Sequence, residues 1–167
     1  WTGWYFAGNS TYTGLNVNFY VQFKNYWGFC AGINRNGNKL SNSALRGGPM
    51  LALPGHWNIW YNIESDQRKL FTYVLGGSSN WGDNGFQKSN AFFGMISYKP
   101  SKNILLSLIP EIMFRNSELQ FVTNTDWNGN ARYINASIDQ VSYDLSIRLE
   151  YSINPELTIQ YFGRPFI

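Results

Sequence analysis

The chain has 167 residues, the usual length of one domain, and this is enough to bury a core. Only 14% of the residues are charged, whereas 18% are aromatic and 16 are glycines, which excludes a disordered tail and disfavours a helical bundle. The net charge is +3, but no run of Lys or Arg forms a stripe for nucleic acid, so no nucleic-acid partner is expected.

Alternation of apolar and polar residues is the clearest pattern along the chain. It is present in residues 15–24 and occurs again, without exception, over residues 141–153. The second stretch is much longer than an average strand of about 5–6 residues and exceeds the roughly 9–11 residues of a tilted membrane-spanning strand. In chain order, the predicted strands cover residues 1–8, 15–24, 26–34, 56–64, 69–76, 88–98, 103–123, 131–153 and 157–165.

The predicted connections are alternately short and long. Short turns fall at 24–25, 65–69, 99–103 and 154–156, whereas longer connections rich in Gly, Asn and Ser fall at 9–14, 34–55, 76–87 and 124–130. This is typical of an outer-membrane barrel, so we expect an all-β, antiparallel, up-and-down transmembrane β-barrel. Bacterial barrels have even strand numbers, so nine strands and an opening Trp1 predict that residues 1–167 are part of one larger barrel domain, without an internal boundary.

Two positions break the pattern. Apolar residues occupy even positions at Ile134, Ala136 and Ile138 but odd positions from Val141, which predicts a bulge near 139–140. Pro110 lacks a backbone N–H, so we expect a bulge or a missing pair there. Trp60 and Phe92 fall on the polar face by simple alternation.

The strand over residues 141–153 supplies the candidate site residues. In a barrel, one face of this strand contacts lipid and the other lines the lumen, where Arg148 pairs with Glu150 or across the ladder. The polar face either fills the interior or serves permeation or binding. The lipid-facing set is Val141, Tyr143, Leu145, Ile147 and Leu149, and the lumen-facing set is Ser142, Asp144, Ser146, Arg148 and Glu150.

The connections and single residues add weaker hypotheses. We interpret Arg46, Gly47, Gly48 and Pro49 as the anchor of the 34–55 connection, folded into the lumen, where Arg46 meets acidic wall residues. Residues 81–85 and 126–130 are interpreted as turns, with contact to sugar as the alternative for the first and calcium binding for the second. Cys30 and His56 are the only residues of their types, which excludes a multi-histidine or cysteine metal centre. No cofactor, metal or catalytic residue is predicted, and we expect no enzyme.

A series of short motifs follows the chain in order: Arg46-Gly47-Gly48-Pro49, Pro54-Gly55 before Trp57, Ser65-Asp66 with Arg68-Lys69, Gly76-Gly77, Tyr98-Lys99-Pro100-Ser101, Tyr133, Asp139-Gln140, Arg148-Leu149 with Tyr151, Asn154-Pro155 with Leu157, and Tyr161 with Pro165-Phe166. This series resembles domain of unknown function family 5916, a family of outer-membrane barrels of Bacteroidota type. The resemblance implies the C-terminal part of such a barrel, often following an N-terminal domain similar to family 9 carbohydrate-binding modules. That additional domain would supply a glycan partner. The resemblance implies no activity.

The functional hypothesis is an outer-membrane protein of a Gram-negative bacterium that contacts outer-membrane lipid. It would act as a membrane anchor, a scaffold or a narrow pore, or as a subunit of an envelope complex for transport, secretion or assembly. The alternative is a soluble secreted β-barrel that binds a small apolar ligand or a glycan, with the apolar face of each strand turned inward.

Overall fold

The computed structural model describes residues 1–6, 8 and 10–165. Outside this part lie one residue of the predicted first strand, the first residue of the 9–14 connection and the phenylalanine of the Pro165-Phe166 motif. In the part that is described, no helix is long and apolar enough to cross a membrane.

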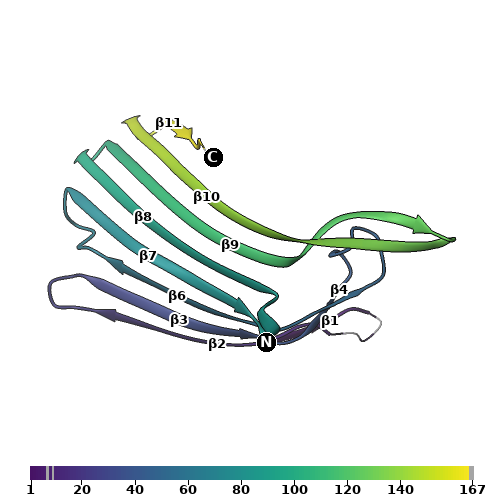
Figure 1. Ribbon diagram of the computed structural model, residues 1–167. Coiled ribbons are helices and arrows are strands. Elements are labelled where there is room, and N and C mark those ends of the chain that lie inside the picture. Colours follow the sequence, from purple (N-terminus) through teal and green to yellow (C-terminus); the bar gives the residue numbers. More distant parts are fainter. Residues whose placement is uncertain (7, 9, 166–167) are drawn as a thin grey trace.

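The protein is all-β, as predicted. Nine strands form one antiparallel sheet in the order β1-β2-β3-β6-β7-β8-β9-β10-β11, and a small hairpin, β4–β5, is inserted between β3 and β6. Figure 1 shows the nine strands side by side in chain order in one curved sheet. Within the described residues the sheet is open, because β1 and β11 do not pair with each other. The strands are β1 (Thr2–Trp4), β2 (Ser10–Gln22), β3 (Gly28–Asn36), β4 (Lys39–Ser41), β5 (Leu51–Leu53), β6 (His56–Glu64), β7 (Phe71–Gly82), β8 (Gln87–Ser101), β9 (Ile104–Trp127), β10 (Asn130–Asn154) and β11 (Leu157–Gly163).

The connections at one end of the sheet are the predicted short turns, shown on the left of Figure 1. At the other end, two connections are shorter than predicted. β7 extends to Gly82 and β9 to Trp127, so the predicted 76–87 and 124–130 connections shrink to 83–86 and 128–129. The prediction was wrong there because Asn, Ser and Gly were taken as loop residues, whereas their backbones pair with neighbouring strands over most of both segments.

A long two-stranded ribbon projects from this second end (Figure 1). β8 begins opposite Ser117, so the part of β9 beyond Ser117 pairs only with β10. The tip is the two-residue turn Asn128-Gly129, with φ of 55° and 77°, the conformation that Asn-Gly favours in a tight hairpin. The Gly129 N–H donates to the Asp126 carboxylate over 2.9 Å, so the turn predicted over 126–130 is present but confined to residues 128–129.

The bulge predicted at 139–140 lies elsewhere. Asp139 and Gln140 pair regularly with β9, and the register shifts instead occur between Ile134 and Asn135 and between Ala136 and Ile138. Both extra residues belong to β9, a fact that alternation within β10 alone does not reveal. The missing pair at Pro110 is confirmed: β8 and β9 share no ladder pairs between Phe93 and Ile96, although Pro110 still pairs with β10.

The two faces of the sheet differ sharply in chemistry. Residues that oppose each other in a ladder share a face, so the register assigns every position. We call the face that contains Asn58 the polar face and the face that contains Ile59 the apolar face. Trp60 lies on the polar face, as predicted, but Phe92 lies on the apolar face, opposite Ile112. Alternation failed at Phe92 because the next residue, Phe93, is also aromatic.

The apolar face is uncovered. Leu45 is the one buried apolar residue among those described, and it belongs to the 37–55 connection rather than to the sheet. The sheet therefore has no apolar core of the kind that stabilises soluble domains. The exposed apolar-face residues include Leu15, Val17, Phe19, Ile33, Ile59, Ile63, Leu75, Phe92, Ile96, Leu106, Leu108, Val141, Tyr143 and Ile147.

Candidate functional site: the polar face and the short-turn end

A row of side-chain amides crosses five strands of the polar face. Asn16 pairs with Asn34, Asn34 with Asn58, Asn58 with Asn80, and Asn80 with Ser89 in successive ladders. Each Asn donates its amide to the next member, over 2.7 Å from Asn34 to Asn58, 2.8 Å from Asn58 to Asn80 and 3.1 Å from Asn80 to the Ser89 hydroxyl. The Asn16 amide donates to Asn34 in the same way. We call these five residues the amide ladder.

The polar face is neutral on one side and charged on the other. From β2 to β7 it carries mostly amides and small residues, together with Tyr20, His56, Trp60 and Val74, and its one carboxylate, Glu64, lies beside the short turns. Ser89 of the amide ladder opposes Arg115, and Arg115 opposes Gln140, so the row continues into the charged half. Amides on the neutral half suit water and neutral hydroxyl-bearing solutes, whereas the charged half suits ions. The charged half contains Glu111, Arg115, Asp144, Arg148, Glu150 and Arg164.

The predicted lumen-facing residues all lie on this charged half. Arg148 lies 3.8 Å from the Glu150 carboxylate, one of the two pairings expected for it. The Arg164 guanidinium donates to Asp144 over 2.6 Å, and the Ser146 hydroxyl donates to the same carboxylate over 3.4 Å. Ser142 accepts from the Gln140 amide over 3.1 Å. Each of the five predicted lumen-facing residues therefore has a polar partner on this face.

The predicted lipid-facing residues lie on the apolar face of β10. Val141, Tyr143 and Ile147 are exposed, while Leu145 and Leu149 are half-buried. None of the five is buried in a core.

The 37–55 connection reaches the projecting ribbon. The ring of Tyr133 in β10 lies so close to Gly48 that a side chain there would collide with it. The Arg46 guanidinium lies 5.9 Å from the centroid of the Phe121 ring in β9, so its contact is with a ring and not with the acidic wall residue that we expected. Arg46 and Gly47 both have positive φ, of 46° and 100°. Arg46 and Gly48 thus hold the β3–β6 connection against β9 and β10, where these strands form the projecting ribbon.

At the second end of the sheet, an ion pair joins β3 to the β7–β8 turn. Arg35 in β3 donates to the Asp83 carboxylate over 2.8 Å and lies 5.3 Å from the Trp57 ring centroid. The hydrogen bond from Arg35 lowers the pKa of Asp83. The turn predicted over residues 81–85 is thus confined to η1 (Asp83–Gly85), a single 3-10 turn after β7, because Trp81 and Gly82 belong to the strand. His56 begins β6 with its ring 3.1 Å from the Asn36 amide.

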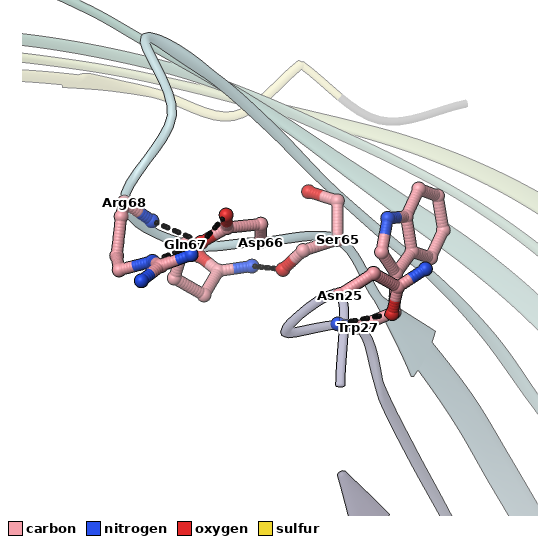
Figure 2. Close-up of polar contacts among 6 residues, drawn as sticks. All are labelled: Asn25, Trp27, Ser65, Asp66, Gln67 and Arg68. Atoms are coloured by element: carbon pink, nitrogen blue, oxygen red, sulfur yellow. Dashed lines mark hydrogen bonds and ion pairs between the residues drawn. The ribbon is translucent and has the colours of Figure 1, made fainter. Parts of the chain in front are cut away.

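The turn between β6 and β7 holds a buried carboxylate that the sequence did not reveal. Ser65 and Asp66 are buried, with 5% and 6% of their surface exposed. Asp66 accepts from the Arg68 backbone N–H over 3.1 Å and from two nitrogens of the Arg68 guanidinium over 2.8 Å each (Figure 2). The Arg68 hydrogen bonds lower the pKa of Asp66 to about 2. The Ser65-Asp66 and Arg68-Lys69 motifs are the only signal of this arrangement in the sequence.

This turn contacts the neighbouring β2–β3 turn. The Arg68 guanidinium lies 3.2 Å from the centroid of the Tyr26 ring. Tyr26 itself has a φ of 65°, and the next residue, Trp27, donates its backbone N–H to the Asn25 side chain over 3.2 Å (Figure 2). Arg68 therefore connects two turns that are separated by a full hairpin in the chain.

Within the described residues, no three His, Cys, Asp or Glu side chains are grouped to hold a metal ion. Cys30 is half-buried, and its thiol donates to the Asn62 side chain over 2.9 Å. The amide ladder was missed because Asn80 was assigned to a predicted loop. Asn at alternate strand positions in neighbouring strands was the signal that could have found it.

Comparison with known proteins gives one match. Residues 5–167 match the family described as Domain of unknown function (DUF5916). No curated protein and no solved structure matches the chain. The family's description assigns no activity. Because the match covers nearly the whole chain, this protein belongs to the DUF5916 family.

Proposed function

We propose that this sheet is part of a β-barrel that spans the outer membrane of a Gram-negative bacterium, where it acts as an anchor, a scaffold or a narrow pore. The observation that supports this proposal most strongly is that the apolar face is exposed while the polar face is joined by hydrogen bonds. A sheet in water would be expected to cover its apolar face and expose its polar face, because burial of apolar side chains is favourable there. In a bilayer, apolar residues face lipid and polar residues face the lumen.

Aromatic residues at both borders of the apolar face support the proposal. On β7, Trp81 stands near the long-connection end and Phe71 near the short turns, ten residues apart. At about 3.3 Å per residue and a tilt of about 40°, they would lie about 25 Å apart along the membrane normal, the usual height of the apolar band. Phe71 stacks on Tyr98, with ring centroids 4.4 Å apart, so the aromatic border beside the short turns continues onto β8. Aromatic girdles of this kind flank the apolar band of outer-membrane barrels.

The partners proposed are outer-membrane lipid and other proteins of an envelope complex. A glycan would be bound by an additional domain of the kind that the family resemblance implies. No catalytic role is proposed. The soluble alternative, a secreted barrel for a small apolar ligand or a glycan, requires the apolar face to be internal, and the exposure of Val141 and Tyr143 disfavours it.

The test begins by replacing the chain's one cysteine, Cys30. After Cys30→Ser, one cysteine at a time is introduced at positions 143 to 148 and labelled with an environment-sensitive fluorophore in protein reconstituted into phosphatidylcholine vesicles. We expect labels at 143, 145 and 147 to be quenched by a lipid-soluble quencher and labels at 144, 146 and 148 by an aqueous quencher. Uniform aqueous quenching at all six positions would reject the membrane proposal.

Pore and anchor functions need a separate measurement. The complete protein is inserted into a planar bilayer, and its conductance is recorded. A stable single-channel current that changes in Arg115→Gln would favour the pore, because Arg115 lies on the polar face. A folded, inserted protein without current would leave the anchor or scaffold function.

A further inference from the structure

The short-turn end contains a cationic cleft at the rim of the sheet. The cleft, of about 350 Å³, lies between the β6–β7 turn and the β8–β9 turn. A backbone hydrogen bond of 2.9 Å from the Lys99 N–H to the Leu70 carbonyl holds the two turns together. Its polar lining is Gln67, Arg68, Lys69, Lys99, Ser101 and Lys102, and no carboxylate lines it.

The cleft keeps a strong positive charge. Four cations line the cleft, and Asp66 neutralises one of them, Arg68, by an ion pair of 2.8 Å. In the part of the chain that the structure describes, Lys69, Lys99 and Lys102 have no carboxylate within 4.0 Å. Glu150 lines the adjoining cleft, which it shares with Lys99 and Lys102, and is itself 3.8 Å from Arg148. Three unpaired ammonium groups around one cleft favour an anion.

The position of the cleft indicates where that anion comes from. Leu70 lines the cleft, is exposed and opposes Lys99, one position beyond Phe71 and Tyr98, whose stacked rings lie on the apolar face. Along the strands, the cleft thus lies at the level where the apolar face ends. In a bilayer this is the level of the headgroups, where Lys and Arg side chains are attracted to anionic lipids.

We propose that this cleft binds the phosphate of an anionic phospholipid headgroup in the leaflet that the short turns contact. The inference rests on the proposed membrane function. Lys69, Lys99 and Lys102 would act as point charges on the phosphate oxygens, and Gln67 and Ser101 would offer hydrogen bonds. Arg68, held by Asp66 and Tyr26, would set the position of the β6–β7 turn beside them.

The test compares lipid retention by native mass spectrometry on the full-length protein, purified in detergent and offered equal amounts of phosphatidylglycerol and phosphatidylcholine. We expect preferential retention of phosphatidylglycerol, reduced at least fivefold in the triple variant Lys69→Gln, Lys99→Gln, Lys102→Gln. A matched control removes three cations near the other end of the sheet, by Lys39→Gln, Lys88→Gln and Arg132→Gln, and should retain the lipid. Single variants Lys69→Gln and Lys99→Gln should each show a partial loss, which guards against misfolding of the triple variant.

Two further arms separate the outcomes. Inorganic phosphate, added at the same ionic strength as a chloride control, should not displace the lipid; displacement would reassign the cleft to a soluble phosphate compound. Equal retention of both lipids by the native protein, or equal loss in both triple variants, would overturn the proposal. Flotation with pure phosphatidylcholine vesicles tests membrane insertion separately: a protein that floats but shows no lipid preference loses only the cleft, whereas one that never floats loses both proposals.

Discussion

The guanidinium of Arg68 lies over the ring of Tyr26, 3.2 Å from its centroid, and thereby joins the β6–β7 turn to the β2–β3 turn. A cation over an aromatic face contributes about 0.5–1 kcal/mol at an exposed site. The Arg68 side chain is 59% exposed, so the contact belongs to that class. The contact depends on the ring, and replacing the ring tests it directly.

We expect Tyr26→Phe to retain the unfolding free energy within about 0.3 kcal/mol and Tyr26→Leu to lose about 0.5–1 kcal/mol. Both variants keep a side chain at the same positive φ, so backbone strain is matched. Urea unfolding in detergent micelles, followed by tryptophan fluorescence, measures the difference. In an Arg68→Gln background the two variants should become equal, and a difference that persists there would show that the ring acts without Arg68.

A second prediction concerns pH at the same turn. The pKa of Asp66 is lowered to about 2, first by the hydrogen bonds from Arg68, whereas an unfolded Asp has a pKa of about 3.9. The ionised carboxylate therefore stabilises the turn fully above about pH 4–5, and this stabilisation is lost as the pH falls toward 2. The Arg68 amide, which donates to Asp66, should lose protection from hydrogen exchange over that range.

Hydrogen exchange at pH 5, 4, 3 and 2.5, corrected for the intrinsic rate, measures this loss. Asp66→Asn should start with weaker protection and show little change over the same range. The Tyr26 amide is an internal control, because it donates to the Phe23 carbonyl and not to a carboxylate. Protection of Arg68 that stays constant down to pH 2.5 would contradict the assignment.

A third prediction concerns the amide ladder. Asn58 accepts from Asn34 and donates to Asn80, so its truncation removes two hydrogen bonds. At about 0.5–1.5 kcal/mol each, Asn58→Ala should lower the unfolding free energy by about 1–3 kcal/mol. A double-mutant cycle on Asn34 and Asn58 should give a coupling energy of about 0.5–1.5 kcal/mol. Asn16 and Asn80 are three strands apart, about 14 Å, so their truncations should be additive; a cycle without coupling at Asn34 and Asn58 would show that the ladder does not act as a unit.

The strands could be predicted because alternation is local information. The alternation of apolar and polar residues is visible within residues 15–24 and 141–153 alone, and the structure has β2 and β10 there. The boundaries of β7 and β9 could not be predicted in the same way, because Asn80 and Asp126 are typical loop residues by composition. Pairing with a neighbouring strand makes them part of a ladder, and a single strand does not contain that information.

The site was less predictable than the fold for the same reason. The Arg148–Glu150 pair joins neighbours on one strand face and was expected. The amide ladder joins five strands, and the Arg68–Tyr26 contact joins two turns, so both depend on register. The burial of Asp66 was also missed, because an Asp in a short turn is usually exposed, whereas here the Arg68 side chain folds back and binds it.

The last prediction separates a membrane from water around the apolar face. Leu75 lies on β7 between Phe71 and Trp81, and 61% of its surface is exposed. If that surface faced water, Leu75→Arg would change the unfolding free energy by no more than about 0.5 kcal/mol. If it faces the middle of a bilayer, the same change should cost about 2–4 kcal/mol. Val122 is a matched control, because it is 57% exposed but lies on the projecting ribbon, so Val122→Arg should be nearly neutral. Guanidinium unfolding from phosphatidylcholine vesicles measures both variants, and equal small effects would place the apolar face in water.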